Sequence, residues 1–545
     1  MKPNIIFYLT FIYLSALLTA CSDFLEVESK SQVSDNTLWN SPGNADLFLN
    51  NVYAGLPGPF TTDDPGENWT DNSMASRVGP TSRNIIALSE YAPNNAPSHW
   101  GHYSNIRRAN LFIEKVQSSS LPEDWKKLRI AEARFLRAYY YMILWMYHGG
   151  VPLITDVLNM SEQGDEIFRP RNSSEETFKF ISEECAAIAN DLPAKSDGGR
   201  ATKGSALTLK GWVELVWASP IHNTENLSER WQAAANTNKQ VIDLGVYSLF
   251  SDYNTLHFEE NNYNSEVIFD KPYLGGTGLG GSREGLQGPW RVGGIQRSWG
   301  NVNPTQELVD AYTMANGLPI NDPASGYNPQ KPYENREKRF YQSIIFDGSE
   351  WLGFEMIKRQ GMGSPNETDL SDINEATNTG YSLRKGLNPA YAINGNNQQN
   401  SANFIIFRYA EVLLSYAEAQ NEASGPSAAV YEAVNLVRGR SELPPLKTGL
   451  TKEQMRNAIE RERRIELAFE EKRWYDLIRL RLAEKNLNGH LHGMVIEQAG
   501  GGKLNYKIVE APGGKKFFDP AKNYLLPIPQ AAIDRNPQIT QNPGY

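Results

Sequence analysis

Three glycines give the sequence its clearest motif for cofactor chemistry. Gly276, Gly278 and Gly281 form a G-x-G-x-x-G pattern, and the strand-like stretch EVIFDKPYL precedes them. In a dinucleotide-binding site a helix begins at such glycines, so that its backbone N–H groups meet the pyrophosphate. The residues that follow here are SREGLQGPWRVGG, which do not predict a helix. We therefore expect no nucleotide cofactor at this motif.

Histidines and carboxylates could supply metal ligands or acid–base catalysts. The close histidine pairs are His99 with His102 and His490 with His492, and neither forms H-E-x-x-H or lies beside cysteines. Because zinc sites use such groupings, we predict no metal site and no cofactor. The sequence has no G-x-S-x-G motif, and its 63 acidic residues would bring carboxylates together by chance. We assign no catalytic residue, and a glycosidase carboxylate pair is left as an alternative.

Aromatic side chains in polar loops are stronger candidates, for binding rather than catalysis. Residues 273–300 contain ten glycines together with Tyr273, Trp290, Arg291 and Trp299. So long a segment without predicted secondary structure is usually functional or disordered. An aromatic ring covers the apolar C–H face of a sugar, and a neighbouring arginine can donate hydrogen bonds to its hydroxyls. We predict that these four side chains contact a ligand; the alternative is that the rings fill the helical core.

A second loop, residues 63–77, reads DDPGENWTDNSMASR and combines a ring with polar groups. Its predicted ligand contacts are Trp69, Asp71, Asn72 and Arg77. The polar stretch 361–402 is a candidate for the rim of the same pocket. Trp100 lies at the start of a predicted helix with apolar residues at helical spacing, so we expect it to pack in the core.

The amino-terminal residues predict export and lipid attachment. Residues 5–18 are nearly all apolar, which suits the h-region of a signal peptide and is too short to span a bilayer. This run ends in LLTAC, which resembles the lipobox of bacterial lipoproteins, in which the thiol receives a diacylglycerol. We predict a leader at residues 1–20 and lipidation of Cys21; an ordinary cleavable leader is the alternative. Cys185, the only other cysteine, would then lack a disulfide partner and is predicted to be a buried apolar residue.

The composition indicates a globular chain with an acidic surface. Of the 545 residues, 40% are hydrophobic and 21% are charged, and the formal net charge is −10. Nucleic-acid binding depends on basic surfaces, so this charge argues against nucleic acid as a partner. The 26 tyrosines and 12 tryptophans favour loops that present flat rings.

Amphipathic helices must position the two loops. The clearest is 131–147, where apolar residues recur at i, i+3, i+4 and i+7 before HGGVP ends the helix. Small residues at positions 204, 206 and 211 would let another helix approach closely. Further helices are predicted at 176–193, 202–219, 408–425, 427–440 and 451–481, in two clusters at roughly 100–245 and 404–485.

Local signals add detail to these elements. Thr451 and Gln454 form a predicted capping box at the start of the last helix. Within that helix, ERERRIELAFEEKRW alternates in charge and predicts a solvated face with i, i+4 ion pairs. Short strands are predicted at SEVIFDKPY and NYLLPIP.

The ordered set of motifs resembles the SusD/RagB family of outer-membrane nutrient-binding lipoproteins. The stretch NREKRF departs from the Arg-Asp-Pro-Arg-like stretch that the family usually has, which weakens one loop match. The matching segments cover nearly the whole chain and are LLTACSDFLE, AEARFLRAYYYMILWMYHGGVPLI, GRATKGSALTLKGWVEL, SEVIFDKPY, PTQELVDAYTMANG, FRYAEVLLSYAEAQNE, IERERRIELAFEEKRWYDLIRL and YLLPIPQAAIDRNPQITQNPGY.

The resemblance implies a mainly α, SusD-like fold. Tetratricopeptide-like helix hairpins would form the scaffold, and long irregular loops with a few short strands would form the ligand face. It implies an amino-terminal half at 21–245 and a carboxy-terminal half at 246–545 that make one compact unit. By position only, the loop at 63–77 and the region after EVIF fall where family members bind ligand.

The resemblance also implies a function without catalysis. Members are anchored by lipid to the cell outer membrane, face the exterior and cover a SusC-like TonB-dependent transporter. They bind oligosaccharides, or in some members peptides, and deliver them for import. Two other classes stay open: an anchored glycoside hydrolase, and a helical scaffold protein in which Trp290 and Trp299 would be buried.

Overall fold

A computed structural model describes residues 38–59, 66–75, 82–196, 198–359, 377–393 and 399–545. The helices are α3 (Pro42–Ala54), α4 (Ser82–Ala87), α5 (His102–Ser118), α6 (Glu123–His148), α7 (Met160–Gln163), α8 (Ser174–Ile188), α9 (Lys203–Ala218), α10 (Ser228–Asp243), α11 (Arg283–Gln287), α12 (Gln306–Ala311), α13 (Lys338–Ser343), α14 (Pro389–Ala392), α15 (Tyr409–Ser424), α16 (Ala428–Arg440), α17 (Lys452–Glu466), α18 (Arg473–Arg479), α19 (Ala483–Asn486) and α20 (Gln530–Arg535). Short 3₁₀ turns are η2 (Gly66–Trp69), η3 (Gly164–Ile167), η4 (Glu259–Asn261) and η5 (Gly500–Gly502). The predicted leader and Cys21 lie outside the described residues.

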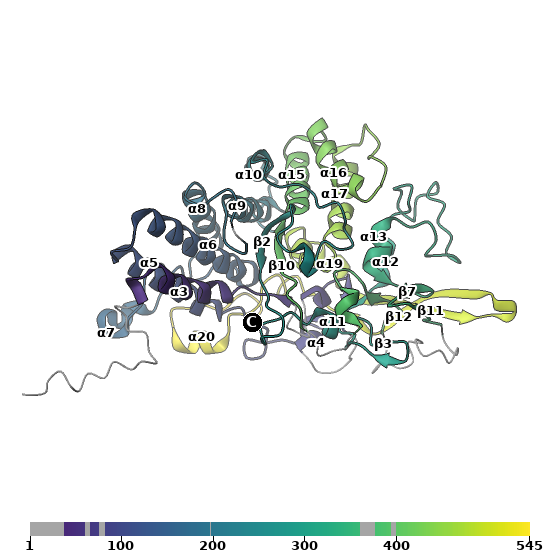
Figure 1. The fold of residues 1–545 in the computed structure, drawn as a ribbon, viewed down its shortest axis with the longest axis horizontal. Coiled ribbons are helices and arrows are strands. Elements are labelled where there is room, and N and C mark those ends of the chain that lie inside the picture. The colour runs from purple at the N-terminus through teal and green to yellow at the C-terminus, as the bar shows by residue number, and fades with distance from the viewer. Residues whose placement is uncertain (1–37, 60–65, 76–81, 197, 360–376, 394–398) are drawn as a thin grey trace, which may run out of the picture.

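The long helices form one continuous scaffold. In order, α5 packs on α6, α6 on α8, α8 on α9 and α9 on α10. The row continues as α10 packs on α15, which also contacts α16 and α17. Figure 1 shows the two predicted helix clusters side by side along this row, with the loops and short strands below and to one side. The predicted mainly α fold is confirmed.

Helix α6 confirms and extends the helix predicted at 131–147. Glu123 lies in its first turn, where the helix dipole favours negative charge. From Phe135 to His148 every side chain is buried, so this half of the helix is surrounded by protein on all faces. The helix ends at Gly149, whose φ of +74° is rarely adopted by residues with a Cβ.

Helices α9 and α10 pack closely through small residues, as predicted. A Cβ on Gly211 would lie 2.9 Å from Nδ2 of Asn238 in α10. Gly204 contacts a loop and not a helix, because its Cβ would collide with the phenol of Tyr247, which follows the end of α10. The capping box of Thr451 with Gln454 is also confirmed. Helices α8 and α9 begin with capping boxes that the sequence analysis missed.

All the described strands form two-stranded antiparallel sheets. Their pairs are β1 (Ser73–Met74) with β5 (Asn303–Pro304), β2 (Val267–Lys271) with β10 (Phe404–Arg408), β3 (Arg291–Val292) with β4 (Ile295–Gln296), β6 (Ile344–Ile345) with β9 (Ser382–Leu383), β7 (Ser349–Trp351) with β8 (Phe354–Met356), and β11 (Gly489–Gln498) with β12 (Leu504–Lys516). Strand β2 confirms the strand predicted within SEVIFDKPY, whereas the long β11–β12 hairpin, which projects from the body in Figure 1, was missed.

The strand predicted at NYLLPIP is wrong. Its backbone groups are used outside any ladder: the Leu526 N–H donates to the carbonyl of Tyr147 at 2.7 Å. The Leu526 carbonyl in turn accepts from Nδ2 of Asn542 at 2.7 Å. The segment therefore seals the end of α6, and its apolar residues are buried there rather than in a sheet.

The single helix predicted at 451–481 is also wrong, because the chain breaks between α17 and α18. Phe469 and Glu471 adopt φ of +63° and +61°, outside the helical region. Cations from distant segments take up the carbonyls at the end of α17: Arg408 Nη2 donates to the Glu466 oxygen at 2.8 Å, and Lys385 Nζ donates to it at 2.9 Å. These bonds replace the partners that a continuing helix would supply.

The charge-rich run 460–474 does not form the predicted solvated face. Glu466 is fully buried and Glu470 is 3% exposed. Arg408 joins them, with ion-pair distances of 2.6 Å to Glu466 and 2.7 Å to Glu470. Arg408 also binds Glu266 at 2.7 Å. The alternating charges therefore belong to an interior ion-pair network, which joins the end of β10 and the residue before β2 to the break after α17.

Two clusters of buried apolar side chains lie beneath these elements. The larger contains residues from Trp39 to Leu526, and the smaller contains residues from Val292 to Ile496. Cys185 is fully buried in the larger cluster, and burial raises the pKa of its thiol. Trp100 packs at the margin of the same cluster, as predicted. No helix in the described part of the chain is long and apolar enough to cross a membrane.

Candidate functional site

The structure brings the two predicted loops together. Strand β1 of the first loop pairs with β5, which follows the second loop. Nδ2 of Asn68 donates to the Asn301 carbonyl at 2.9 Å, and Nε2 of Gln287 donates to the Pro59 carbonyl at 3.1 Å. The described parts of both loops thus form one continuous region at the base of the helical scaffold (Figure 1).

Trp290 and Trp299 form an aromatic pair on the outside of the second loop. Their ring centroids lie 5.8 Å apart with an interplanar angle of 63°. Trp299 is 37% exposed, Trp290 is half-buried and Arg291 is exposed. The alternative that these two rings fill the core is therefore wrong.

Further apolar side chains are exposed around this pair. The turn between β3 and β4 lies on the β7–β8 hairpin, because a Cβ on Gly293 would lie 2.5 Å from the ring of Phe354. Arg297 donates to the Ile393 carbonyl. Half of the large exposed apolar residues in the described chain lie on the second loop or on the two segments that contact it, namely Leu274, Leu279, Ile295, Trp299, Phe354 and Ile393. Such a concentration is typical of a binding surface.

The structure places Asp71 in the interior instead of on a ligand-facing surface. Asp71 is 2% exposed, and its carboxylate accepts from Nε and Nη2 of Arg473 at 2.8 and 2.9 Å. Arg464 lies 3.1 Å away, and Nδ2 of Asn486 donates at 2.7 Å. Burial opposes ionisation of this carboxyl, but Arg464 and Arg473 hold its pKa well below the usual value.

Asn72 is likewise fully buried. Its amide donates to Oε1 of Glu67 at 2.8 Å, and its carbonyl oxygen accepts from Nε of Arg464 at 2.8 Å. The amide group therefore binds within the first loop, and the carbonyl oxygen holds this loop to α17. Arg77, the remaining candidate in this loop, lies outside the described residues.

Trp69 and Tyr273 are both buried near a cavity under the two loops. Trp69 is 7% exposed and lines the cavity. Tyr273 is 8% exposed, and its phenol lies against Gly58, one of the cavity-lining residues. The structure thus separates the seven described candidates into an exposed or half-buried group, a pair at the cavity and an interior ionic group.

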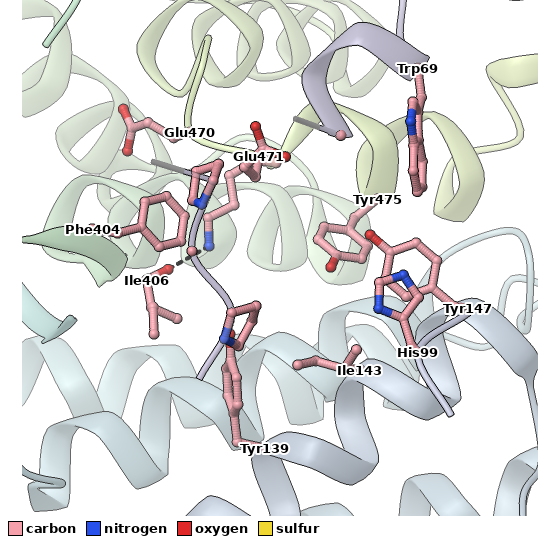
Figure 2. A pocket seen from close by; sticks show the side chains of 15 residues that line it. Trp69, His99, Tyr139, Ile143, Tyr147, Phe404, Ile406, Glu470, Glu471 and Tyr475 are labelled. Atoms are coloured by element: carbon pink, nitrogen blue, oxygen red, sulfur yellow. Dashed lines mark hydrogen bonds between the residues drawn. The ribbon is translucent and has the colours of Figure 1, made fainter. Parts of the chain in front are cut away.

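The cavity has a volume of about 240 Å³ and lies between α6, α18, β10 and the first loop. Figure 2 shows Trp69, Tyr475, Tyr147 and His99 gathered on one side, with Phe404, Ile406, Tyr139 and Ile143 across from them. The remaining lining residues are Pro57, Gly58, Pro59, Gly66, Glu470, Glu471 and Lys472. The wall is mostly aromatic and apolar.

The aromatic wall is held by ring contacts. The Trp69 ring meets Trp474 edge to face at 5.5 Å and Tyr147 at 6.1 Å. His99 stacks on Tyr147 with centroids 3.8 Å apart. These contacts fix the rings in place, so the cavity is formed before any ligand arrives.

The titratable groups of the cavity are mostly uncharged at neutral pH. Burial and the neighbouring Glu67 raise the pKa of Glu471 to about 8, although the backbone N–H groups of Gly66 and Glu67 bind its carboxyl. Burial and the nearby His148 hold the pKa of His99 well below its usual value. Lys472 donates to the Ile406 carbonyl at 2.7 Å and pairs with Glu411 at 2.9 Å.

The motifs considered for cofactors do not assemble in this structure. The G-x-G-x-x-G is followed by α11, so the expectation of no helix there is wrong, but this helix has five residues. Strand β2 pairs antiparallel with β10, unlike the parallel strand of a dinucleotide fold. Among the described residues no group of three or more His, Cys, Asp or Glu side chains is arranged to hold a metal ion.

Sequence reasoning missed most of the cavity. Tyr139 and Ile143 were predicted as buried helix positions, without a cavity beside them. Glu471 and Tyr475 reach the cavity because the chain breaks between α17 and α18, and the periodicity of the sequence gave no signal for that break. His99 was considered only as a metal ligand.

Comparisons with known proteins agree along the chain. Residues 265–545 match the model described as the SusD family, and residues 23–213 match a model described as starch-binding associating with outer membrane. The chain is 38% identical to SusD-like protein P2 of Formosa agariphila, over 98% of this chain and 99% of that protein. It is 26% identical to SusD-like protein P38 of the same organism, over 89% and 93%.

Solved structures share the fold. A SusD-like protein from Bacteroides fragilis superposes with a TM-score of 0.79 and 29% identity, over 94% of this chain and 99% of that one. A SusD-like carbohydrate binding protein from the same species gives a TM-score of 0.78 and 28% identity, over 92% of this chain and all of that one.

Proposed function

The chain belongs to the SusD family, and from this premise we propose that it is a lipid-anchored outer-membrane protein that binds oligosaccharides. Its relative from Bacteroides fragilis is described as carbohydrate binding, and the family model that matches residues 23–213 is described as starch-binding. We further propose that the protein delivers its ligand to a SusC-like TonB-dependent transporter and catalyses no reaction.

The observation that carries the proposed binding function is the aromatic pair of Trp299, which is 37% exposed, and Trp290, which is half-buried. An exposed indole leaves a large apolar ring in water, and the ring contacts described above hold the pair together. A sugar presents an apolar C–H face that such a ring can cover. The exposed Arg291, next in sequence to Trp290, carries donors suited to the hydroxyls at the edge of that sugar.

The binding test is isothermal titration across a glycan panel. We expect at least one oligosaccharide to bind. We expect Trp299→Ala to weaken its binding about fivefold, since an aromatic contact contributes on the order of 1 kcal/mol beyond buried area. The matched control is Leu436→Ala on α16, which removes a side chain that is 49% exposed on the side of the molecule opposite β3 (Figure 1).

Three outcomes would refute this proposal. If the protein binds peptides and no glycan, its ligands are peptides, the other class that such uptake systems take. Release of reducing sugar from a polysaccharide would make the protein a hydrolase. Equal affinity of the wild type and Trp299→Ala for a bound glycan would move the binding surface elsewhere.

The anchor is tested separately. We propose that the Cys21 thiol carries lipid, which needs more than one acyl chain for stable attachment. Cys21→Ser should move the protein from the outer-membrane fraction to the soluble fraction of the envelope. Retention of the variant with outer vesicles would refute lipid anchoring, and co-purification of a TonB-dependent transporter with the wild type would support the delivery step.

A further inference from the structure

Resting on the glycan-binding function proposed above, we infer that the cavity lined by Trp69 and Tyr475 is a second binding site that takes one uncharged sugar ring. Trp290 and Trp299 are not among the residues that line it. The exposed pair and the cavity can therefore be altered independently.

The volume of the cavity limits its occupant to about one ring. Pockets for drug-sized ligands measure roughly 300–1,000 Å³. At about 240 Å³ this cavity lies below that range, although it is far larger than the space of one water molecule. A chain of several sugars would not fit inside, so an oligosaccharide could place only an end unit there.

Two buried nitrogens have no hydrogen-bond partner among the described residues. These are Nε1 of Trp69, whose side chain is 93% buried, and Nε2 of His99. A buried donor left unpaired costs about 1–3 kcal/mol, so it is expected to be satisfied when the site is in use. Figure 2 shows both rings on the same side of the cavity. Hydroxyl groups suit this pair, because each can donate or accept.

The rest of the wall suits the apolar side of a sugar. Tyr139 and Tyr147 from α6 and Tyr475 from α18 supply three further rings, and Ile143 and Ile406 supply aliphatic surface. A pyranose has C–H groups that pack on such rings, while its hydroxyls point outward from the edge. The combination of a ring-lined wall with a few polar atoms is typical of small-molecule sites.

The charge state of the cavity favours a neutral occupant. At pH 7 Glu471 is mostly protonated, because burial raises its pKa to about 8, and His99 is uncharged. The charged groups at the wall are paired with protein: Lys472 with Glu411 and Glu470 with Arg408. A uronate or an amine would enter without a counter-ion and would lose its hydration. The cavity should therefore select uncharged sugars.

The probes for this site are D-glucose, D-galactose, D-mannose, D-xylose and D-glucuronate, each added to the full chain. Saturation-transfer NMR should show binding of at least one neutral sugar and none of glucuronate. Trp69→Phe keeps a ring but removes the indole N–H, and should lower the affinity for that sugar about tenfold. Trp212→Phe is the matched control, because Trp212 is 4% exposed in the same core and lies outside the cavity.

Tyr475→Phe provides a second variant, in case Trp69→Phe does not fold. It removes only a hydroxyl at the cavity wall and should also lower the affinity for the sugar. Leu436→Ala, which alters neither the tryptophan pair nor the cavity, should leave the binding of monosaccharides and oligosaccharides unchanged.

Two results would overturn the inference. One is that no neutral sugar binds the wild type, even if oligosaccharides bind through the exposed pair; this would leave the proposed function standing. The other is that a folded cavity variant, Trp69→Phe or Tyr475→Phe, binds the sugar as tightly as the Trp212→Phe control does. Failure of every oligosaccharide to bind would instead refute the proposed function itself.

Discussion

Replacing Asp71 by asparagine tests whether this residue serves the fold or the ligand. The substitution keeps the shape of the side chain but removes its charge. Arg473 and Arg464 would remain in the interior with their main partner gone, since Asp71 accepts from Arg473 at 2.8 and 2.9 Å and lies 3.1 Å from Arg464. Breaking a buried ion pair from one side costs about 3–5 kcal/mol, which lowers the folding equilibrium constant at least about a hundredfold.

The assay is urea unfolding followed by tryptophan fluorescence and by circular dichroism. The matched control is Asp243→Asn, which breaks an i, i+4 pair with Lys239 in which the aspartate side chain is 59% exposed. Such surface pairs contribute about 0.3–0.5 kcal/mol, so the two identical chemical changes should differ about tenfold in free energy. If Asp71→Asn costs no more than Asp243→Asn and glycan affinity falls instead, Asp71 contacts ligand and our interpretation of its burial is wrong.

Three further predictions concern stability. Lowering the pH from about 4 to about 2 should reduce the urea midpoint, because cationic partners lower the pKa of five carboxyls and the unfolded chain then binds more protons than the folded one; a constant midpoint would contradict this. These carboxyls are Asp71, Glu184, Glu466, Glu470 and Asp476. Thr451→Ala removes the capping oxygen of α17 and should cost about 1 kcal/mol, whereas Thr448→Ala in the exposed loop before it should change stability little. Gly150→Ala places a Cβ against the Asn172 carbonyl and should cost about 1–3 kcal/mol, while Gly439→Ala, with open space around it in α16, should be stabilising; similar effects at both sites would argue against a steric cause.

Local patterns predicted the helices well. Helix α6, the capping box of α17 and the close contact at Gly211 each depend on residues within a few turns of one another, or on residue size alone. A 3.6-residue period and a short polar cap are sufficient to identify such elements. The predicted family followed from motifs spread along the chain, and the comparisons confirm it.

Features that depend on distant partners could not be predicted in this way. The break after Glu466 exists because Arg408 and Lys385 bind its carbonyl, and nothing within the run 451–481 encodes those partners. Arg408 also pairs with the acidic side chains of Glu466 and Glu470. Charges that the sequence pattern placed in solvent are therefore buried. For the candidate site, sequence reasoning selected two loops that the structure brings together, but it could not distinguish the exposed Trp299 from the buried Trp69, since both lie in polar, glycine-containing segments.

The partners of the first loop have a consequence for the order in which the chain can fold. Asp71 and Asn72 are satisfied by Arg464, Arg473 and Asn486, which are synthesised about 400 residues later. Until the ribosome has synthesised that last segment, Asp71 and Asn72 lack the side chains that bind them in the folded protein. The loop therefore cannot adopt its folded conformation. A nascent chain or a fragment that stops before residue 486 would therefore keep this loop open to proteases, even though the α5–α10 helices that follow it already have local neighbours to pack against.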